Sequence, residues 1–144
     1  MPNHLAKRAA LIARCNAAPK ARDGEFPAVM VEEFFDGNDD LGSILCNADP
    51  HPGLAAVRNA LLAVSSRPEV EAVMIRIQET MEDDDEAWPY AEQALIVTDA
   101  DPDEVRSWFD EALAPADVWE LEDRVEGLPA PRAAGARTLV AWWD

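Results

Sequence analysis

The feature of this sequence that most constrains its fold is a pair of alternating apolar stretches on either side of an acidic run. In residues 70–80 an apolar side chain recurs at every second position, which is the periodicity of a β-strand with one buried face. Residues 91–98 repeat the pattern. Between the two stretches lie five consecutive acids, Glu82–Glu86. We therefore expect two strands joined by a solvated, acidic hairpin tip.

Three segments have the apolar spacing of amphipathic helices. The first is residues 4–18, with Leu5 on its apolar stripe and a proline directly after it. The second is residues 54–64. The third begins after Asp101, which is a good N-cap because a proline and then an acid follow in the first turn, and its apolar stripe continues to Leu113.

Further strands are predicted on both sides of these helices. Residues 26–35 alternate in the manner of a strand with one well-buried face. Residues 36–40, with the sequence DGNDD, have turn chemistry, so residues 41–46 are expected to return as a second strand. Residues 118–121 and 138–143 are predicted as two short strands near the end of the chain.

This order of elements predicts an α+β fold, with a mostly antiparallel sheet, two helices on one face and an N-terminal helix. Two arrangements are open. The first is a duplicated ββα unit, because each half has a helix that opens on Ala-Asp-Pro, at residues 48–50 and at residues 100–102. The second is a ferredoxin-like arrangement, which requires residues 41–46 to be a loop.

The charge of the chain is strongly and unevenly acidic. Its 144 residues are enough for one domain with a substantial core, and 29 acids against 12 Lys and Arg give a formal net charge of −17. This excess argues against a nucleic-acid partner, because phosphates are bound by Lys and Arg. Residues 1–24 have a balance of +4, whereas residues 25–144 carry −21. We predict a basic N-terminal helix or arm over 1–24, which can lie against a single acidic domain formed by 25–144.

The sequence predicts a cytoplasmic protein without a membrane partner. It contains no run of about 18 apolar residues. The apolar stretch after Lys7 and Arg8 is interrupted by Arg14, which leaves it too short for a secretory signal. Cys15 and Cys46 have the spacing of neither a disulfide framework nor a zinc site.

The abundant acids raise the question of a metal site, since Ca²⁺ and Mg²⁺ prefer oxygen ligands. Consecutive acids in the run at 82–86 point apart in an extended chain and do not converge on one ion. The acids within residues 36–40 and 99–110 begin with the spacing of an EF-hand loop, but Leu41 and Glu104 occupy the positions where that loop requires glycine. No phosphate-binding or dinucleotide-binding glycine motif is found. We therefore predict no metal and no cofactor.

Side chains suited to catalysis are few. One histidine lies in the basic segment, and the other, His51, stands between two prolines. Cys46 is close enough in sequence for a Cys–His pair, but we predict structural roles for both residues. Glu32, Glu33 and Glu79 are the best candidates for acid–base chemistry. We assign no catalytic residue, and a carboxylate-based, divalent-metal-dependent enzyme is the alternative to a binding protein.

The aromatic residues support the leading hypothesis, because tryptophan is enriched at the hot spots of protein interfaces. One tryptophan of Trp142–Trp143 has to face outward if that segment is a strand. We predict a non-catalytic binding or regulatory module that engages a basic protein partner. A homodimer, formed through a sheet edge or through the Trp142–Trp143 end, is a further alternative. The residues assigned to the partner surface are Asp83, Asp84, Asp85, Trp88 and Tyr90.

Five short segments carry a resemblance to known proteins, namely EEFFDGN at 32–38, HPG at 51–53, RPEV at 67–70, WP at 88–89 and AWWD at 141–144. Together they resemble small, acidic, uncharacterised bacterial proteins that carry no assigned activity. The resemblance covers nearly everything after residue 25. It implies a bacterial, cytosolic protein of one domain, and it provides no catalytic residues to transfer.

Overall fold

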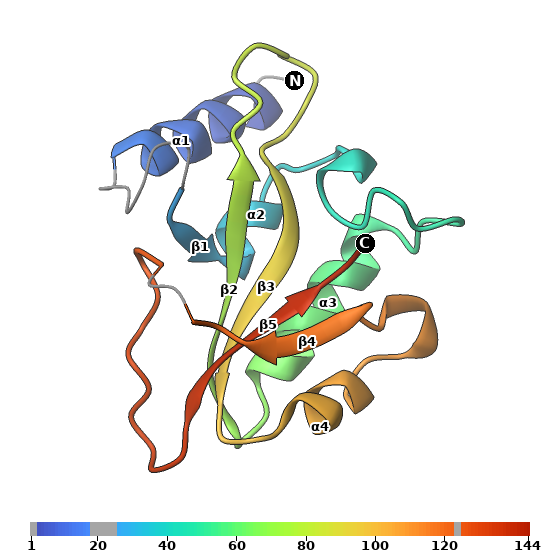
Figure 1. Cartoon of the computed structure of the whole chain (residues 1–144). Helices are drawn as coiled ribbons and strands as arrows, with labels where there is room; N and C mark the ends of the chain where they lie inside the picture. Colours follow the sequence, from blue (N-terminus) through green and yellow to red (C-terminus); the bar gives the residue numbers. More distant parts are fainter. Residues whose placement is uncertain (1–2, 18–25, 123–124) are drawn as a thin grey trace.

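A computed structural model of the chain describes residues 3–17, 26–122 and 125–144, which form one five-stranded sheet with its helices (Figure 1). The sheet is antiparallel throughout, in the order β1-β2-β3-β5-β4. The predicted α+β class is therefore confirmed. The strands are β1 (Ala28–Met30), β2 (Val70–Glu79), β3 (Tyr90–Thr98), β4 (Asp117–Glu120) and β5 (Arg137–Trp142). The helices are α1 (Asn3–Ala17), α2 (Val31–Phe35), α3 (Leu54–Ser65) and α4 (Pro102–Ser107), with two short 3₁₀ helices, η1 (Leu41–Ser43) and η2 (Glu111–Leu113).

The predicted hairpin of β2 and β3 is present and lies in the middle of the sheet. Its register pairs Val73 with Ile96 and Ile75 with Ala94, so that buried side chains of the two strands are neighbours. The turn that joins the strands projects beyond the sheet and lies beside α1 (Figure 1). The alternation of apolar residues therefore identified both the strands and their connection.

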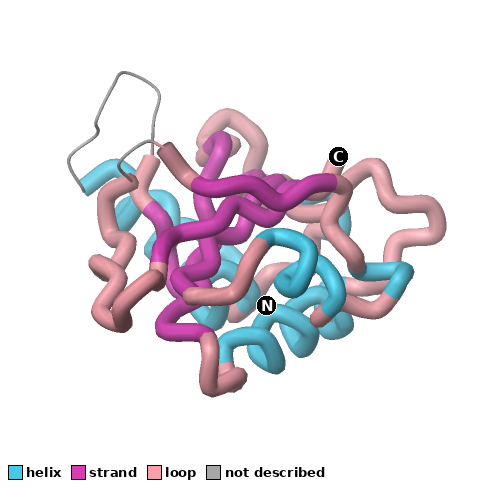
Figure 2. The backbone as a smooth tube through the Cα atoms, turned by 60° about the horizontal axis from the view of Figure 1, so that its bottom comes forward, coloured by secondary structure: helices cyan, strands magenta, loops and turns pink. Residues whose placement is uncertain are grey.

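The main apolar core lies on one face of the sheet. Helix α3 contributes Val57, Leu61 and Val64, each exposed by 2% or less. Residues of α1, α2 and α4 join the same cluster. Most of the helical chain accordingly lies on one side of the strands (Figure 2). The predicted placement of two helices on one face is confirmed for α3 and α4.

The opposite face of the sheet carries no helix within the parts of the chain that the structure describes. Met74, Leu95 and Val140 line this face in a smaller apolar cluster. The segment between β4 and β5 covers the cluster with Val125 and Leu128. One face of the sheet is thus closed by helices, whereas the other is closed only in part, by an irregular segment.

The prediction of a strand over residues 26–35 is wrong for its second half. Only β1 pairs with β2, after which the chain turns into α2. Phe34 and Phe35 are both buried, which a strand with a single buried face does not allow at consecutive positions. The Glu33 side chain accepts the Met30 N–H at 3.1 Å, so this acid supports the start of the helix.

The prediction of a second strand at residues 41–46 is also wrong. The segment begins with η1, and Asp40 caps it by accepting the Gly42 N–H at 2.9 Å. Because the first half then has no second strand, it is not a ββα unit, and no duplication of that unit is present. Strand β1 lies directly beside an antiparallel β2, so the split βαβ arrangement of a ferredoxin-like fold is not present either.

The remaining predicted helices and strands agree with the structure to within about one residue at each end, except for the end of the helix after Asp101. Asp101 caps α4 and accepts the Glu104 N–H at 3.0 Å, as predicted. Helix α4 ends at Ser107, before the predicted end at Leu113, which lies in η2. None of the helices described is long and apolar enough to cross a membrane. The predicted boundary between residues 24 and 25 falls outside the described residues.

Candidate functional site

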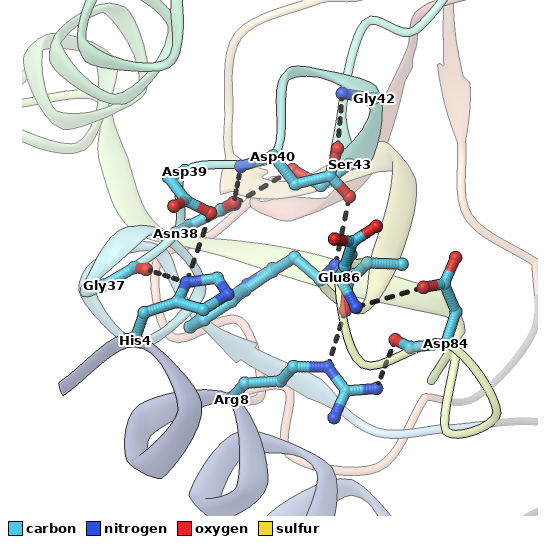
Figure 3. A network of polar contacts seen from close by, with 12 residues as sticks. His4, Arg8, Gly37, Asn38, Asp39, Asp40, Gly42, Ser43, Asp84 and Glu86 are labelled. Atoms are coloured by element: carbon cyan, nitrogen blue, oxygen red, sulfur yellow. Dashed lines mark hydrogen bonds and ion pairs between the residues drawn. The ribbon is translucent and has the colours of Figure 1, made fainter. Parts of the chain in front are cut away.

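The acidic tip, defined here as residues 81–87, is held by a buried arginine of α1. Arg8 is only 7% exposed. Its Nε donates to the carbonyl oxygen of Ala87 at 2.6 Å, and its Nη2 donates to the carbonyl oxygens of Met81 at 2.7 Å and Asp84 at 2.8 Å (Figure 3 draws the bond to Asp84). A buried guanidinium requires several acceptors, and three carbonyls of one loop provide them. The tip is thus wrapped around a cation that belongs to the chain itself.

The backbone of the acidic tip is further ordered by its own hydrogen bonds. The N–H of Asp84 donates to the Met81 carbonyl at 3.2 Å, and the Ala87 N–H donates to the Asp84 carbonyl at 3.1 Å. The Asp84 side chain accepts the Glu86 N–H at 3.0 Å. All five acids of the tip are nevertheless exposed. The tip therefore presents carboxylates to solvent from a fixed backbone, which agrees with the predicted solvated hairpin tip.

A second acidic segment, the aspartate loop, defined here as residues 36–40, lies against the end of the tip. Asp40 joins the two, because its Oδ2 accepts the Trp88 N–H at 3.0 Å. Within the loop, the Asn38 side chain accepts the Asp40 N–H at 2.9 Å and donates to Ser43 at 2.9 Å (Figure 3). Two acidic segments that are more than forty residues apart in sequence thus form one surface.

Helix α1 places basic and polar side chains along this surface. Lys7 pairs with Asp36 at 2.6 Å, and His4 Nδ1 lies 3.2 Å from Asp39 Oδ1 and 2.9 Å from the Gly37 carbonyl (Figure 3 draws the His4 contacts). Farther along the helix, Arg14 pairs with Glu33 at 2.7 Å and Asn16 donates to Glu82. Helix α1 therefore lies against acidic segments of the same chain.

The residues assigned to a partner surface do not all lie on it. Asp83, Asp84 and Asp85 are exposed on the acidic tip. Trp88 is only 1% exposed, with its ring 5.6 Å from that of His4, so the expectation that it faces a partner is corrected: it is a core residue. Tyr90 is half-buried.

Tyr90 forms a small polar cluster with two neighbours. Its hydroxyl lies 3.3 Å from the Cys46 sulfur and donates to Glu92 at 3.3 Å. Burial first, and then the adjacent Cys46 and Glu92, raise the pKa of Tyr90 above its ordinary value. Tyr90 is therefore a neutral hydrogen-bonding group at physiological pH, and its contacts lie within the chain.

The side chains considered for catalysis have structural contacts. His51 Nδ1 accepts the Gly53 N–H at 2.9 Å, so its Nε2 is the protonated nitrogen and donates to the Ile44 carbonyl at 2.9 Å. Cys46 contacts Tyr90, as described above, and not His51. Glu33 is engaged by Met30 and Arg14, whereas Glu32 and Glu79 are exposed on α2 and at the end of β2. Among the described residues, no group of three or more potential ligands is arranged to hold a metal ion.

Sequence reasoning missed the role of Arg8 and of the aspartate loop. The buried face of α1 runs through Arg8, Leu11 and Cys15, whereas Leu5, which was predicted on the apolar stripe, is 55% exposed. Arg8, Leu11 and Cys15 are separated by three and then four residues, which is the spacing of one face of a helix. This spacing was the signal in the sequence that Arg8 lies on the buried face of α1. Nothing in the sequence pairs residues 36–40 with the tip, since that contact depends on the path of α2.

Comparison with known proteins supports the resemblance inferred from the sequence. Residues 6–139 match the protein family described as the uncharacterized protein YfbO family. The chain is 38% identical, over 121 residues, to a protein of Escherichia coli (strain K12) described as uncharacterized protein YfbO. That alignment covers 82% of this chain and 83% of the relative. No solved structure matches the chain. Neither description mentions an activity, a ligand or a partner.

Proposed function

The chain belongs to the uncharacterized YfbO family, and we propose that it is a non-catalytic binding module that captures a basic protein through its acidic tip. The observation that carries this proposal is the contact of Arg8 with three carbonyls of the tip. This contact fixes the loop, so its carboxylates do not have to be ordered when a partner binds. Such preorganisation lowers the entropic cost of association.

The charge of the tip is available to a partner. None of the ion pairs among the described residues involves Asp83, Asp84 or Asp85. The neighbouring Asp36 and Glu33 are already paired with α1. A surface of this kind, on a chain with a net charge of −17, attracts cationic partners over long distances and accelerates their association.

The experiment that tests the proposal is a pull-down from lysate of the native host with the wild-type chain and a triple variant, Asp83→Asn, Asp84→Asn and Asp85→Asn. Washes at low salt and at about 0.5 M salt separate specific capture from diffuse attraction, because the Debye length is about 4 Å at the higher salt. Mass spectrometry identifies what is retained. We expect the wild-type chain to retain a basic protein through the high-salt wash and the variant to lose it.

A matched control removes as much charge elsewhere on the surface, by the changes Asp99→Asn, Asp103→Asn and Glu111→Gln. All three control residues are exposed and lie outside the tip. We expect the control to capture the same partner as the wild-type chain. Equal losses in both variants would mean that only net charge matters. Undiminished capture by the tip variant would remove the tip from the proposal.

The two alternative functions receive less support. A carboxylate-based, divalent-metal-dependent enzyme would use Glu32, Glu33 or Glu79, but Glu33 already contacts Arg14 and Met30. A homodimer through the free edge of β4 would place Asp117 of one copy opposite Glu120 of the other in a two-fold antiparallel pairing. Like charges opposite each other destabilise such a pairing.

A further inference from the structure

The face of the sheet that lacks helices holds a pair of tryptophans near its β4 edge. Val118 points into the main core, so strand alternation places its neighbour Trp119 on the opposite face. Trp119 is 38% exposed. Its ring lies 6.3 Å from the ring of the half-buried Trp142 on β5, at an angle of 55° between the ring planes. The two rings form an aromatic surface open to solvent.

A carboxylate stands beside this surface. Asp117 is on the same face of β4 as Trp119, and the strand register places it directly opposite Trp142. Its Oδ1 accepts the Val118 N–H at 2.8 Å, which orients the carboxylate. Asp117 is exposed. We refer to Asp117, Trp119 and Trp142 as the tryptophan site.

A tryptophan ring and a carboxylate also occur together around Arg67, and there they hold its guanidinium. The Arg67 guanidinium lies 4.3 Å from the centre of the Trp108 ring, and its Nη2 is 3.3 Å from Glu69. An indole ring and a carboxylate thus hold one arginine. No cation from the part of the chain that the structure describes lies over Trp119 or Trp142. Among the described residues, the tryptophan site has the rings and the carboxylate but no arginine.

We infer that the tryptophan site binds an arginine side chain of the basic protein partner. The guanidinium stacks on an indole ring by a cation–π interaction and pairs with Asp117. Arginine is favoured over lysine because its planar group stacks on the ring and presents several donors to the carboxylate. This inference rests on the proposed function, because the net charge of −17 is what brings a basic partner to the surface.

The test uses the full chain, labelled with ¹⁵N, and two peptides of equal charge, hexa-arginine and hexa-lysine. The chain has five tryptophans, and each indole N–H gives its own NMR signal. We expect hexa-arginine to shift the signals of Trp119 and Trp142 saturably, without shifting those of the buried Trp88 and Trp143. We also expect hexa-arginine to bind about threefold more tightly than hexa-lysine, which is the range of an exposed cation–π contact.

Two variants separate this inference from the proposed function. Trp119→Ala should weaken hexa-arginine binding more than hexa-lysine binding and thereby abolish the difference between the two peptides. The triple Asn variant of the acidic tip should weaken both peptides but preserve their difference. If the Trp119 and Trp142 signals do not move while the tip variant still weakens binding, the inference fails and the proposed function stands. If neither peptide binds at low salt, both fail.

A second copy of the chain is the competing occupant of this face. Sedimentation velocity on a dilution series distinguishes it. We expect a monomer for the wild-type chain and for Trp119→Ala. A wild-type dimer that becomes a monomer in Trp119→Ala would overturn the inference, because the aromatic surface would then be covered by the chain itself.

Discussion

Helices α1 and α3 both contribute to the core on the same face of the sheet, but they are attached in different ways. Helix α3 buries Val57, Leu61 and Val64, and its contact with the sheet is apolar. Helix α1 buries Leu11 and Cys15 together with the charged Arg8, and ion pairs and hydrogen bonds surround these residues. The first attachment depends on the apolar area removed from water, whereas the second depends largely on complementary charge.

The difference indicates what the acidic loops can do. Ion pairs at the surface contribute little each and weaken with salt, whereas apolar burial does not. Helix α1 is therefore an example, within the chain, of a basic segment bound by the acidic tip and the aspartate loop. The same surface that we propose for a partner already holds one basic helix through Arg8 and Lys7.

The largest expected effect concerns the apolar attachment. Leu61 has no exposed surface, so Leu61→Ala removes buried methyl groups and leaves a cavity. We expect this change to lower the free energy of unfolding by about 2–5 kcal/mol. Urea denaturation followed by circular dichroism measures it, and the loss should be the same at 0.05 and 0.5 M salt. A loss that changes with salt would contradict the apolar character of this contact.

The next effect concerns the buried cation of α1. Arg8→Ala removes the donor from three carbonyls of the acidic tip. Water reaches part of this loop, so we expect a loss of about 2 kcal/mol in the free energy of unfolding. Hydrogen exchange of the amides at 84 and 87 should also become faster, because their turn loses its support.

The control for this prediction is Arg8→Lys. A lysine preserves the charge, but its single ammonium does not match the three carbonyls that the guanidinium fork reaches. We expect Arg8→Lys to restore little of the stability. If Arg8→Lys fully restored the free energy of unfolding, only the positive charge of this residue would matter. The attachment of α1 would then differ from that of α3 by charge alone and not by the hydrogen bonds of the guanidinium.

A smaller effect is expected at the exposed ion pairs of α1. The Lys7 side chain is 42% exposed and the Arg14 side chain is 48% exposed. Lys7→Ala and Arg14→Ala should each lower the free energy of unfolding by less than about 1 kcal/mol at 0.05 M salt. The difference should disappear at 0.5 M salt. A loss that persists at high salt would show that these side chains act through packing of their aliphatic stems.

The sequence predicted the parts of the fold that have a simple period. The alternation in β2 and β3 and the cap at Asp101 each rest on neighbouring residues, so a local rule identifies them. No local rule decides residues 26–46, because alternating side chains over 26–35 predict a strand, whereas the neighbouring Phe34 and Phe35 are both buried in a short helix. The choice between the two is made by tertiary packing.

The candidate site could be predicted only in part, for a related reason. The acids at 83–85 are conspicuous in the sequence, and their exposure follows from their charge. The burial of Trp88 does not follow from its position next to the acids, because it depends on the packing of α1 over the tip. The position of Asp117 opposite Trp142 depends on the pairing of β4 with β5, which the sequence does not specify.

The smallest effect concerns a third attachment, on the face of the sheet that lacks helices. Glu71 of β2 accepts the N–H groups of Arg132 at 2.8 Å and Ala133 at 2.9 Å, and it thereby anchors the segment between β4 and β5. The Ala133 N–H first, and then the Arg132 N–H, hold the pKa of Glu71 below its ordinary value. This attachment is polar like that of α1, but it is made by one carboxylate and two backbone groups.

A lowered pKa fixes the direction of the pH dependence. The ionised carboxylate stabilises the folded chain at pH values above the pKa of the unfolded chain, and this contribution is lost as the pH falls through the lower, folded pKa. We therefore expect the ¹⁵N–H signal of Ala133 to titrate at a lower pH than the Glu71 carboxyl does in urea-unfolded chain. Glu71→Gln should abolish this titration without weakening the attachment of α1. A midpoint at or above the unfolded value would mean that the two N–H bonds do not stabilise the carboxylate, and the polar attachment would then be confined to α1.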